Sequence, residues 1–296
     1  MCLGSIKMNP SFLLTVDVED WFQVENFKQW IPFSSWSSRE LRVEKNTHRL
    51  LDLLDSVKSN DPKATFFILG WLAERLPGLV REIHDRGHEV ASHGYNHNLS
   101  SKQDPEELRK DLSDSKKLLE EIIGSPVYGY RAPSFAIDDA SLKVVEECGY
   151  MYDSSFNSFA MNGRYGQVDL SYNGKKGIAV QVSETFYELP ISNLSIWNQI
   201  LPVGGGGYFR VTPPPFFKLG VRKILKKENA YLFYTHPWEL DPEQPMVREA
   251  SPFYRFRHYV NLDKTHSWLS ELLEDFSQCH FVTCRQYLEN ARRMHN

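Results

Sequence analysis

Two histidines, His93 and His97, lie four residues apart, directly after residues 89–92. One turn of backbone can direct both imidazoles toward a single metal ion, and histidine nitrogens are common ligands of divalent metals. Two polar surface residues would give the same spacing. The apolar residues ahead of the pair favour a metal site, because they predict a strand that carries the pair to its carboxyl end. We interpret His84 and His88 as surface residues.

Three acids, Asp17, Glu19 and Asp20, follow the apolar run at residues 12–16. Their charges would repel one another unless a cation or a hydrogen-bonding partner compensates them. A solvated turn or a helix N-cap would also explain them. If either Glu19 or Asp20 joined the two histidines, a divalent ion would keep open positions, as catalytic sites require. The acid that does not bind metal could then act as a base.

An arginine and a histidine follow two further strand-like segments. Arg131 comes after residues 127–130, and its guanidinium could orient a carboxylate through two hydrogen bonds. His236 comes after residues 231–234, where an imidazole could move a proton near neutral pH. A surface arginine at a turn and a core histidine with one hydrogen bond are the alternatives.

Segments with strand-like and helix-like patterns alternate along the chain, which predicts an α/β fold with a mainly parallel sheet. Ligands of such folds gather at the carboxyl ends of the strands, where the residues above lie. We expect strands at 12–16, 64–70, 89–92, 127–130, 184–190, 231–234 and 280–283, and helices at 44–57, 79–86, 105–123, 138–148, 264–276 and from 285. The period is lost at about 157–230, where we expect an irregular insertion.

The composition is that of a globular protein. The chain has 296 residues, with 38 acidic and 34 basic side chains and a net charge of -4, so it has no electrostatic reason to bind nucleic acid. Its four cysteines form no C-x-x-C pair, and we expect them to be reduced. We find no run of about 18 apolar residues and no signal-peptide pattern, and we therefore expect no transmembrane segment and a cytoplasmic location. The oligomeric state stays open.

The order of these motifs resembles the polysaccharide deacetylase family, the carbohydrate esterases with a NodB homology domain. The likeness spans most of the chain and includes framework-like segments at 64–67 and 87–90. The motifs are the acids at 17–20, His93 with His97, residues 131–133, residues 153–156 and His236. The later half, at residues 205–210, 236–241 and 258–262, resembles a subgroup found in bacterial exopolysaccharide and surface-glycan loci.

The resemblance implies one catalytic domain over residues 1–296, folded as a distorted (β/α) barrel of about seven parallel strands. It implies a metal-dependent hydrolase that removes N-acetyl groups from the sugars of a glycan or polysaccharide. The cofactor would be a divalent ion, with Zn²⁺ expected and Mn²⁺, Co²⁺, Ni²⁺ or Fe²⁺ also suitable. A different amidohydrolase acting on a cyclic imide or ureide, and a glycan-binding protein without turnover, are the alternatives.

Each motif then receives an implied role. His93 and His97 would bind the metal with Glu19 or Asp20, because the acids here are spaced where the family usually has adjacent aspartates. Asp17 would be the base, His236 the acid, Arg131 the partner of Asp17, and Asp153 the group that orients His236. A backbone N–H near Tyr130 or Arg131 would stabilise the oxyanion. We expect a substrate-binding surface of Trp21, Tyr130, Pro133, Tyr208 and Trp238, with burial in the core as the alternative.

Overall fold

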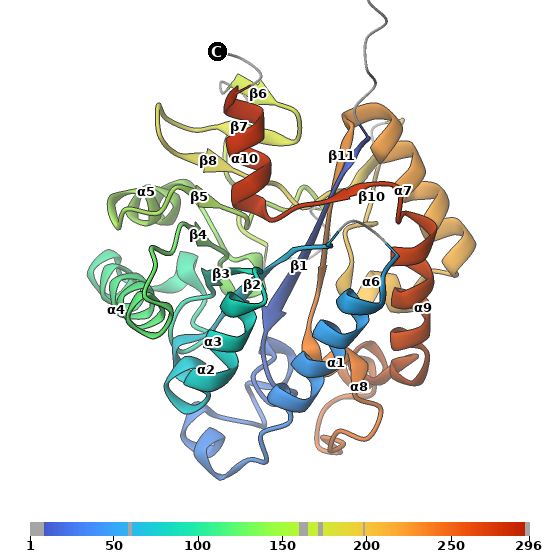
Figure 1. The fold of residues 1–296 in the computed structure, drawn as a ribbon. Helices are drawn as coiled ribbons and strands as arrows, with labels where there is room; N and C mark the ends of the chain where they lie inside the picture. The colour runs from blue at the N-terminus through green and yellow to red at the C-terminus, as the bar shows by residue number, and fades with distance from the viewer. Residues whose placement is uncertain (1–8, 59–60, 160–164, 171–173, 198, 294–296) are drawn as a thin grey trace, which may run out of the picture.

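A curled sheet with helices packed around it forms the body of the protein (Figure 1). The computed structural model describes residues 9–58, 61–159, 165–170, 174–197 and 199–293. The strands are β1 (Ser11–Val18), β2 (Ala64–Ile68), β3 (Glu89–Ser92), β4 (Gly129–Tyr130), β5 (Tyr152–Asp153), β6 (Gly174–Lys176), β7 (Ala179–Gln181), β8 (Tyr187–Glu188), β9 (Leu194–Ile196), β10 (Gln199–Leu201), β11 (Ala230–Thr235) and β12 (His280–Phe281).

The strand order in the main sheet is β11-β1-β2-β3-β4-β5-β8-β7-β6. The strands from β11 to β8 in this order pair in parallel, whereas β7 and β6 are antiparallel. Strand β12 pairs with the beginning of β1, and β9 and β10 form a separate hairpin. The predicted parallel α/β sheet with a distorted-barrel shape is therefore confirmed.

Helices surround the sheet on its outer side (Figure 1). They are α1 (Val43–Ser56), α2 (Gly70–Arg75), α3 (Pro77–Asp85), α4 (Pro105–Ile123), α5 (Asp139–Glu147), α6 (Gly206–Val211), α7 (Pro214–Glu228), α8 (Pro252–Tyr259), α9 (Leu262–Asp275) and α10 (Cys284–Arg293). Short 3-10 turns lie at Glu25–Phe27, Phe33–Ser38, Ser100–Lys102, Pro133–Phe135 and Pro237–Leu240.

Strand β1 lies between β11 and β2 and is buried from Phe12 to Val18. A continuous apolar run suits this position, because both faces of a parallel strand are covered. The strand thus brings the acids that follow it to the carboxyl edge of the sheet, between the ends of β11 and β2. Asp104 caps α4 by accepting the Glu106 N–H, and Pro105 begins the helix, as its fixed φ allows.

Two expectations differ from the structure. The segment that we expected to be irregular contains β6 to β10, α6 and α7, because its strands are too short to show a period in the sequence. His88, which we interpreted as a surface residue, is buried against Phe66 and accepts the Ala64 N–H. Within the described residues, we find no helix with the length and apolarity that a bilayer span needs.

Candidate active site

Three side chains that could bind a metal converge at the carboxyl edge of the sheet. The Oε1 atom of Glu19 lies 3.0 Å from Nε2 of His93 and 2.9 Å from Nε2 of His97. All three residues are buried, and among the described residues they form the one group of this kind. The structure thus brings together residues that are more than 70 positions apart in the chain.

The strand geometry decides between the two acids that the sequence left open. Side chains alternate between the two faces of a strand, so Thr15, Asp17 and Glu19 share one face as β1 ends. Asp20 points elsewhere: its carboxylate accepts the backbone N–H groups of Trp21, Arg42 and Val43. Asp20 is therefore the cap of α1 and not a neighbour of the histidines, which corrects that part of the expected ligand set.

The hydrogen bonds of His93 indicate that this group suits a cation. Its Nδ1 atom lies 2.7 Å from the Arg131 carbonyl oxygen, which can only accept, so Nδ1 carries the proton. The neutral ring then turns the lone pair of Nε2 toward the Glu19 carboxylate, and two acceptors at 3.0 Å need a proton or a cation between them. Burial alone would raise the pKa of Glu19, but the adjacent imidazoles of His97 and His93 hold it well below its usual range.

The loop that carries both histidines is fixed by Asp111 from α4. The Asp111 carboxylate accepts the Tyr95 N–H at 2.9 Å, and burial raises its pKa to about 6 despite that bond. Gly94 has a φ of +74°, and a Cβ atom there would lie 2.8 Å from the same carboxylate. His97 itself adopts a φ of 56°, a strained conformation that concentrates at functional sites. The loop is thus held in the one shape that turns both rings inward.

Asp17 lies beside the metal-binding group and is oriented by Arg131. Its Oδ1 atom accepts a hydrogen bond of 2.7 Å from Arg131, which also donates to Thr15, to the Ser154 carbonyl and to the Ser154 hydroxyl. Both charged groups are buried, with Arg131 fully covered. The guanidinium thus fixes and compensates the carboxylate, in the arrangement expected from the sequence.

His236 directly follows β11 and completes the constellation, near the Asp17 carboxylate oxygen that Arg131 does not hold. Its Nε2 atom lies 3.9 Å from Oδ2 of Asp17, and its Nδ1 atom lies 2.7 Å from Oε1 of Glu239. Arg210 donates to the other carboxylate oxygen of Glu239 at 2.6 Å. Burial alone would lower the pKa of His236, but the Glu239 hydrogen bond and the charge of Glu19 raise it to about 9.

Asp153 does not orient His236, contrary to our expectation. Its two carboxylate oxygens bind the hydroxyl and the N–H of Ser155, whose hydroxyl oxygen accepts the Ala132 N–H at 2.7 Å. Asp153 therefore shapes the loop after β4, behind Arg131. The orienting group is Glu239, which we missed although it stands three residues after His236, the spacing at which a turn brings two side chains together.

The expected oxyanion donors are also occupied. The Arg131 N–H donates to the Ser92 carbonyl within the sheet, at 2.9 Å. Tyr130 is buried beneath the site, and its hydroxyl pairs with that of Ser100. The Arg131 N–H and the Tyr130 hydroxyl are therefore both engaged within the protein.

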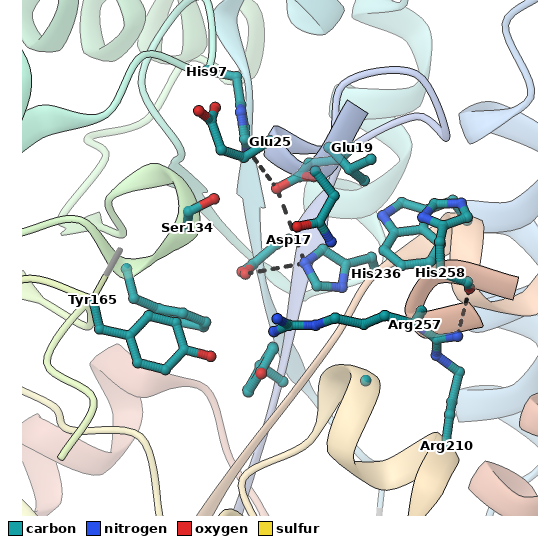
Figure 2. A pocket seen from close by; sticks show the side chains of 16 residues that line it. Asp17, Glu19, Glu25, His97, Ser134, Tyr165, Arg210, His236, Arg257 and His258 are labelled. Carbon is teal, nitrogen blue, oxygen red and sulfur yellow. Dashed lines mark hydrogen bonds and ion pairs between the residues drawn. The ribbon is translucent and has the colours of Figure 1, made fainter. Parts of the chain in front are cut away.

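A pocket opens over these side chains (Figure 2). Of the expected substrate-binding residues, Trp238 lines it, stacked between the rings of His236 and His258. Trp21 and Pro133 are buried outside its lining, as Tyr130 is, and Tyr208 is half-buried nearby. The other lining residues were not predicted, and they come from loops, short 3-10 turns, α6, β11 and α8; they are Val24, Glu25, Asn26, Ser134, Phe135, Tyr165, Gly207, Arg210, Tyr234, Arg257 and His258.

Comparisons with known sequences agree with this arrangement. Residues 37–152 match the sequence model of the polysaccharide deacetylase family, and residues 154–289 match a domain of unknown function, DUF3473. A peptidoglycan-N-acetylglucosamine deacetylase from Bacillus cereus is 38% identical over 104 residues, which are 35% of this chain and 47% of the relative. The chain thus matches about half of that relative's length. These matches support a polysaccharide deacetylase domain in this protein.

Comparisons with solved structures agree on the fold. A candidate polysaccharide deacetylase from Mycobacterium smegmatis superposes with a TM-score of 0.62 at 20% identity, over 96% of this chain and 90% of the other. PuuE allantoinase superposes with a TM-score of 0.55 at 15% identity, over 96% and 90% of the two chains. At these identities the likeness concerns the fold alone, which hosts more than one hydrolytic activity.

Proposed function

We propose that this protein is a metal-dependent hydrolase that removes N-acetyl groups from N-acetylated sugars of a glycan. One observation carries the proposal: Asp17 and His236 face each other beside the convergent Glu19, His93 and His97. A base, an acid and a metal-binding group within one pocket are the parts that amide hydrolysis requires. The deacetylase domain match and the deacetylase relatives make an acetamide the favoured substrate.

Glu19, His93 and His97 would hold the metal. Two imidazoles and one carboxylate with open positions are typical of catalytic zinc sites, and they also suit Mn²⁺, Co²⁺, Ni²⁺ or Fe²⁺. When bound, a divalent cation supplies Lewis-acid polarisation of a carbonyl oxygen and lowers the pKa of water.

The acid and base chemistry belongs to the protein's own residues. Asp17 accepts the proton of the attacking water on Oδ2, because its Oδ1 atom is held by Arg131. His236 donates a proton from Nε2 to the departing amine, since its Nδ1 atom is engaged by Glu239. Trp238 packs against the His236 ring and keeps it in the orientation in which Nε2 faces Asp17. The two groups act on the same amide from within one pocket.

The deciding experiment measures acetate released from an N-acetylglucosamine oligomer by the purified protein, with added Zn²⁺ and with a chelator. We expect release that requires the metal. Allantoin is tested in parallel: turnover of this ureide without acetate release would replace our proposal with the alternative of a cyclic imide or ureide amidohydrolase. Sugar binding without acetate release under every metal would identify a glycan-binding protein instead.

The source of the substrate is also a proposal. The resemblance of residues 205–210 and 258–262 to proteins of exopolysaccharide and surface-glycan loci favours a glycan made by such a system. We propose the cytoplasm as its compartment. Acetate release from whole exopolysaccharide fractions, compared with release from peptidoglycan, tests this origin.

A further inference from the structure

The pocket contains a cation that has no partner among the described residues. Arg257 projects from α8 into the pocket, and Figure 2 shows its side chain extended toward the space beside His236 and Asp17. No described side chain or carbonyl lies within hydrogen-bond or ion-pair distance of its guanidinium. Arg210, the other arginine of the pocket, is engaged by Glu239 and by backbone carbonyls. A half-buried guanidinium stays charged and is costly to leave unpaired.

Two tyrosine hydroxyls accompany this guanidinium. Tyr165 and Tyr234 line the same pocket, and Figure 2 shows the Tyr165 hydroxyl pointing toward Arg257. Burial raises the pKa of Tyr234, which keeps its phenol protonated, while the charge of Arg257 acts in the opposite direction. Within the described part of the chain, neither hydroxyl has a hydrogen-bond partner. Protonated phenols and a guanidinium are all hydrogen-bond donors.

The backbone that carries Arg257 is fixed to the catalytic machinery. Arg210 donates to the carbonyl oxygens of Arg257 and His258 at 3.2 and 2.6 Å, while its Nε atom holds Glu239. The same side chain therefore locks the end of α8 and the residue that orients His236. An anion held by Arg257 would consequently sit at a fixed place relative to the reacting amide.

The acids of the pocket are engaged elsewhere and do not neutralise Arg257. Asp17 pairs with Arg131, and the Oε1 atom of Glu19 faces the two histidines. Glu25, at the opposite wall, has the Lys28 ammonium 3.5 Å away. Arg257 thus remains available for a charge brought by a ligand.

We propose that Arg257, Tyr165 and Tyr234 form a subsite for an anionic oxygen group, a carboxylate or a phosphate, carried by the substrate next to its acetamide. The inference rests on the proposed function and narrows it: the substrate is an acidic N-acetylated glycan. A guanidinium binds either group through paired, charge-assisted hydrogen bonds, and the phenols supply further donors. A neutral chain of N-acetylated sugars could offer these donors only uncharged hydroxyl and carbonyl oxygens, and it would leave the charge of Arg257 uncompensated.

The test measures equilibrium binding to the full-length, metal-loaded protein by isothermal titration calorimetry. The probes are a neutral N-acetylglucosamine tetramer, a tetrasaccharide of alternating N-acetylglucosamine and glucuronate, and N-acetylglucosamine 1-phosphate compared with N-acetylglucosamine. We expect at least one of the two acidic ligands to bind about tenfold or more tightly than its neutral counterpart. The ligand that shows the preference identifies the anion as carboxylate or phosphate.

Two substitutions on α8 make the test specific. Arg257→Gln should abolish the preference for the acidic ligand and leave the neutral ligand unchanged within about twofold. Arg255→Gln is the matched control, since Arg255 lies on the same helix outside the pocket lining. If Arg257→Gln does not fold, as judged by circular dichroism, Tyr165→Phe replaces it and should weaken the binding of the acidic ligand alone by a few-fold.

The outcomes separate the inference from the proposed function. Equal affinity for acidic and neutral probes, or an unchanged preference in both Arg257→Gln and Tyr165→Phe, would overturn the subsite whether or not acetate is released. An equal loss of affinity for the acidic and the neutral probes in Arg257→Gln would also overturn the subsite. Selective acidic binding without acetate release from any substrate would overturn the deacetylase proposal and leave the subsite standing.

Discussion

The Nε2 atom of His236 lies 3.9 Å from the Oδ2 atom of Asp17, and the other oxygen of that carboxylate is held by Arg131. The base and the acid therefore present their free atoms to the same space. This space adjoins Glu19, whose Oε1 atom is 4.0 Å from the same imidazole nitrogen. Because different side chains carry the two proposed functions, single substitutions can test metal binding and proton transfer separately.

Asp17→Asn should stop proton abstraction without loss of metal. The amide cannot accept the proton of the attacking water, so we expect acetate release to fall by roughly 100-fold or more. Glu19, His93 and His97 remain in place, so metal content measured by elemental analysis should stay unchanged. Wild-type turnover in this variant would remove Asp17 from the mechanism.

Glu19→Gln and Asp20→Asn should have different effects. Loss of the Glu19 carboxylate should reduce the bound metal and, with it, acetate release. Asp20→Asn should keep the metal and lower the unfolding free energy by about 1 kcal/mol, since Asp20 caps the start of α1. Elemental analysis and denaturant unfolding of both variants check the pair. Metal loss in Asp20→Asn alone would reverse the two roles.

Glu239→Gln should reduce kcat by roughly tenfold or more, because the His236 ring loses the carboxylate that holds its Nδ1 proton. Metal content should not change. The comparison is Asp153→Asn, whose effect should appear as lower stability, since Asp153 supports the Ser155 turn. Both variants are assayed well below their melting temperatures. A larger kcat loss in Asp153→Asn than in Glu239→Gln would contradict the assignment.

We expect the unfolding free energy to decrease in mild acid because His88 is buried in its neutral form. Burial lowers its pKa from 6.5 to about 4, so the unfolded chain takes up the proton first as the pH decreases. The stability from the neutral ring is complete above pH 6.5 and should be lost between pH 6.5 and pH 4, by up to about 3 kcal/mol.

His88→Gln keeps an acceptor for the Ala64 N–H and should flatten the unfolding free energy across that range. His84→Gln, at a partly exposed position of α3, is the control and should retain the wild-type slope. Denaturant titrations at several pH values provide the measurement. Parallel slopes for the wild type and His88→Gln would show that another group titrates.

The sequence was sufficient for the alternation of strands and helices, because a continuous apolar run such as residues 12–16 predicts a buried strand and the amphipathic helices have a strong period. It was sufficient also for the meeting of His93 with an acid of β1. The sequence could also have predicted Glu19 rather than Asp20 as the neighbour of the histidines. Asp17 and Glu19 are two positions apart, and side chains two positions apart in a strand point to the same face.

Other features could not be predicted in this way. Glu239 lies beside His236 only because Pro237 begins a tight 3-10 turn there. Arg257 and Tyr165 meet in the pocket although they come from a late helix and an aperiodic loop, and no spacing relates them. His88 is buried because it packs against Phe66 of β2. The polarity of a histidine considered alone does not indicate such packing.

The position of β1 between β2 and β11 has a practical consequence for anyone who dissects this chain. A truncation that began at residue 37, where the deacetylase match starts, would discard this strand and separate β11 and β12 from the rest of the sheet. It would also remove all three acids of the pocket, Asp17, Glu19 and Glu25, and leave the imidazoles with no carboxylate opposite them. The segments on either side of residue 153 each hold only part of the machinery, so neither half should be active when expressed alone, and the N-terminal strand must accompany any engineered fragment.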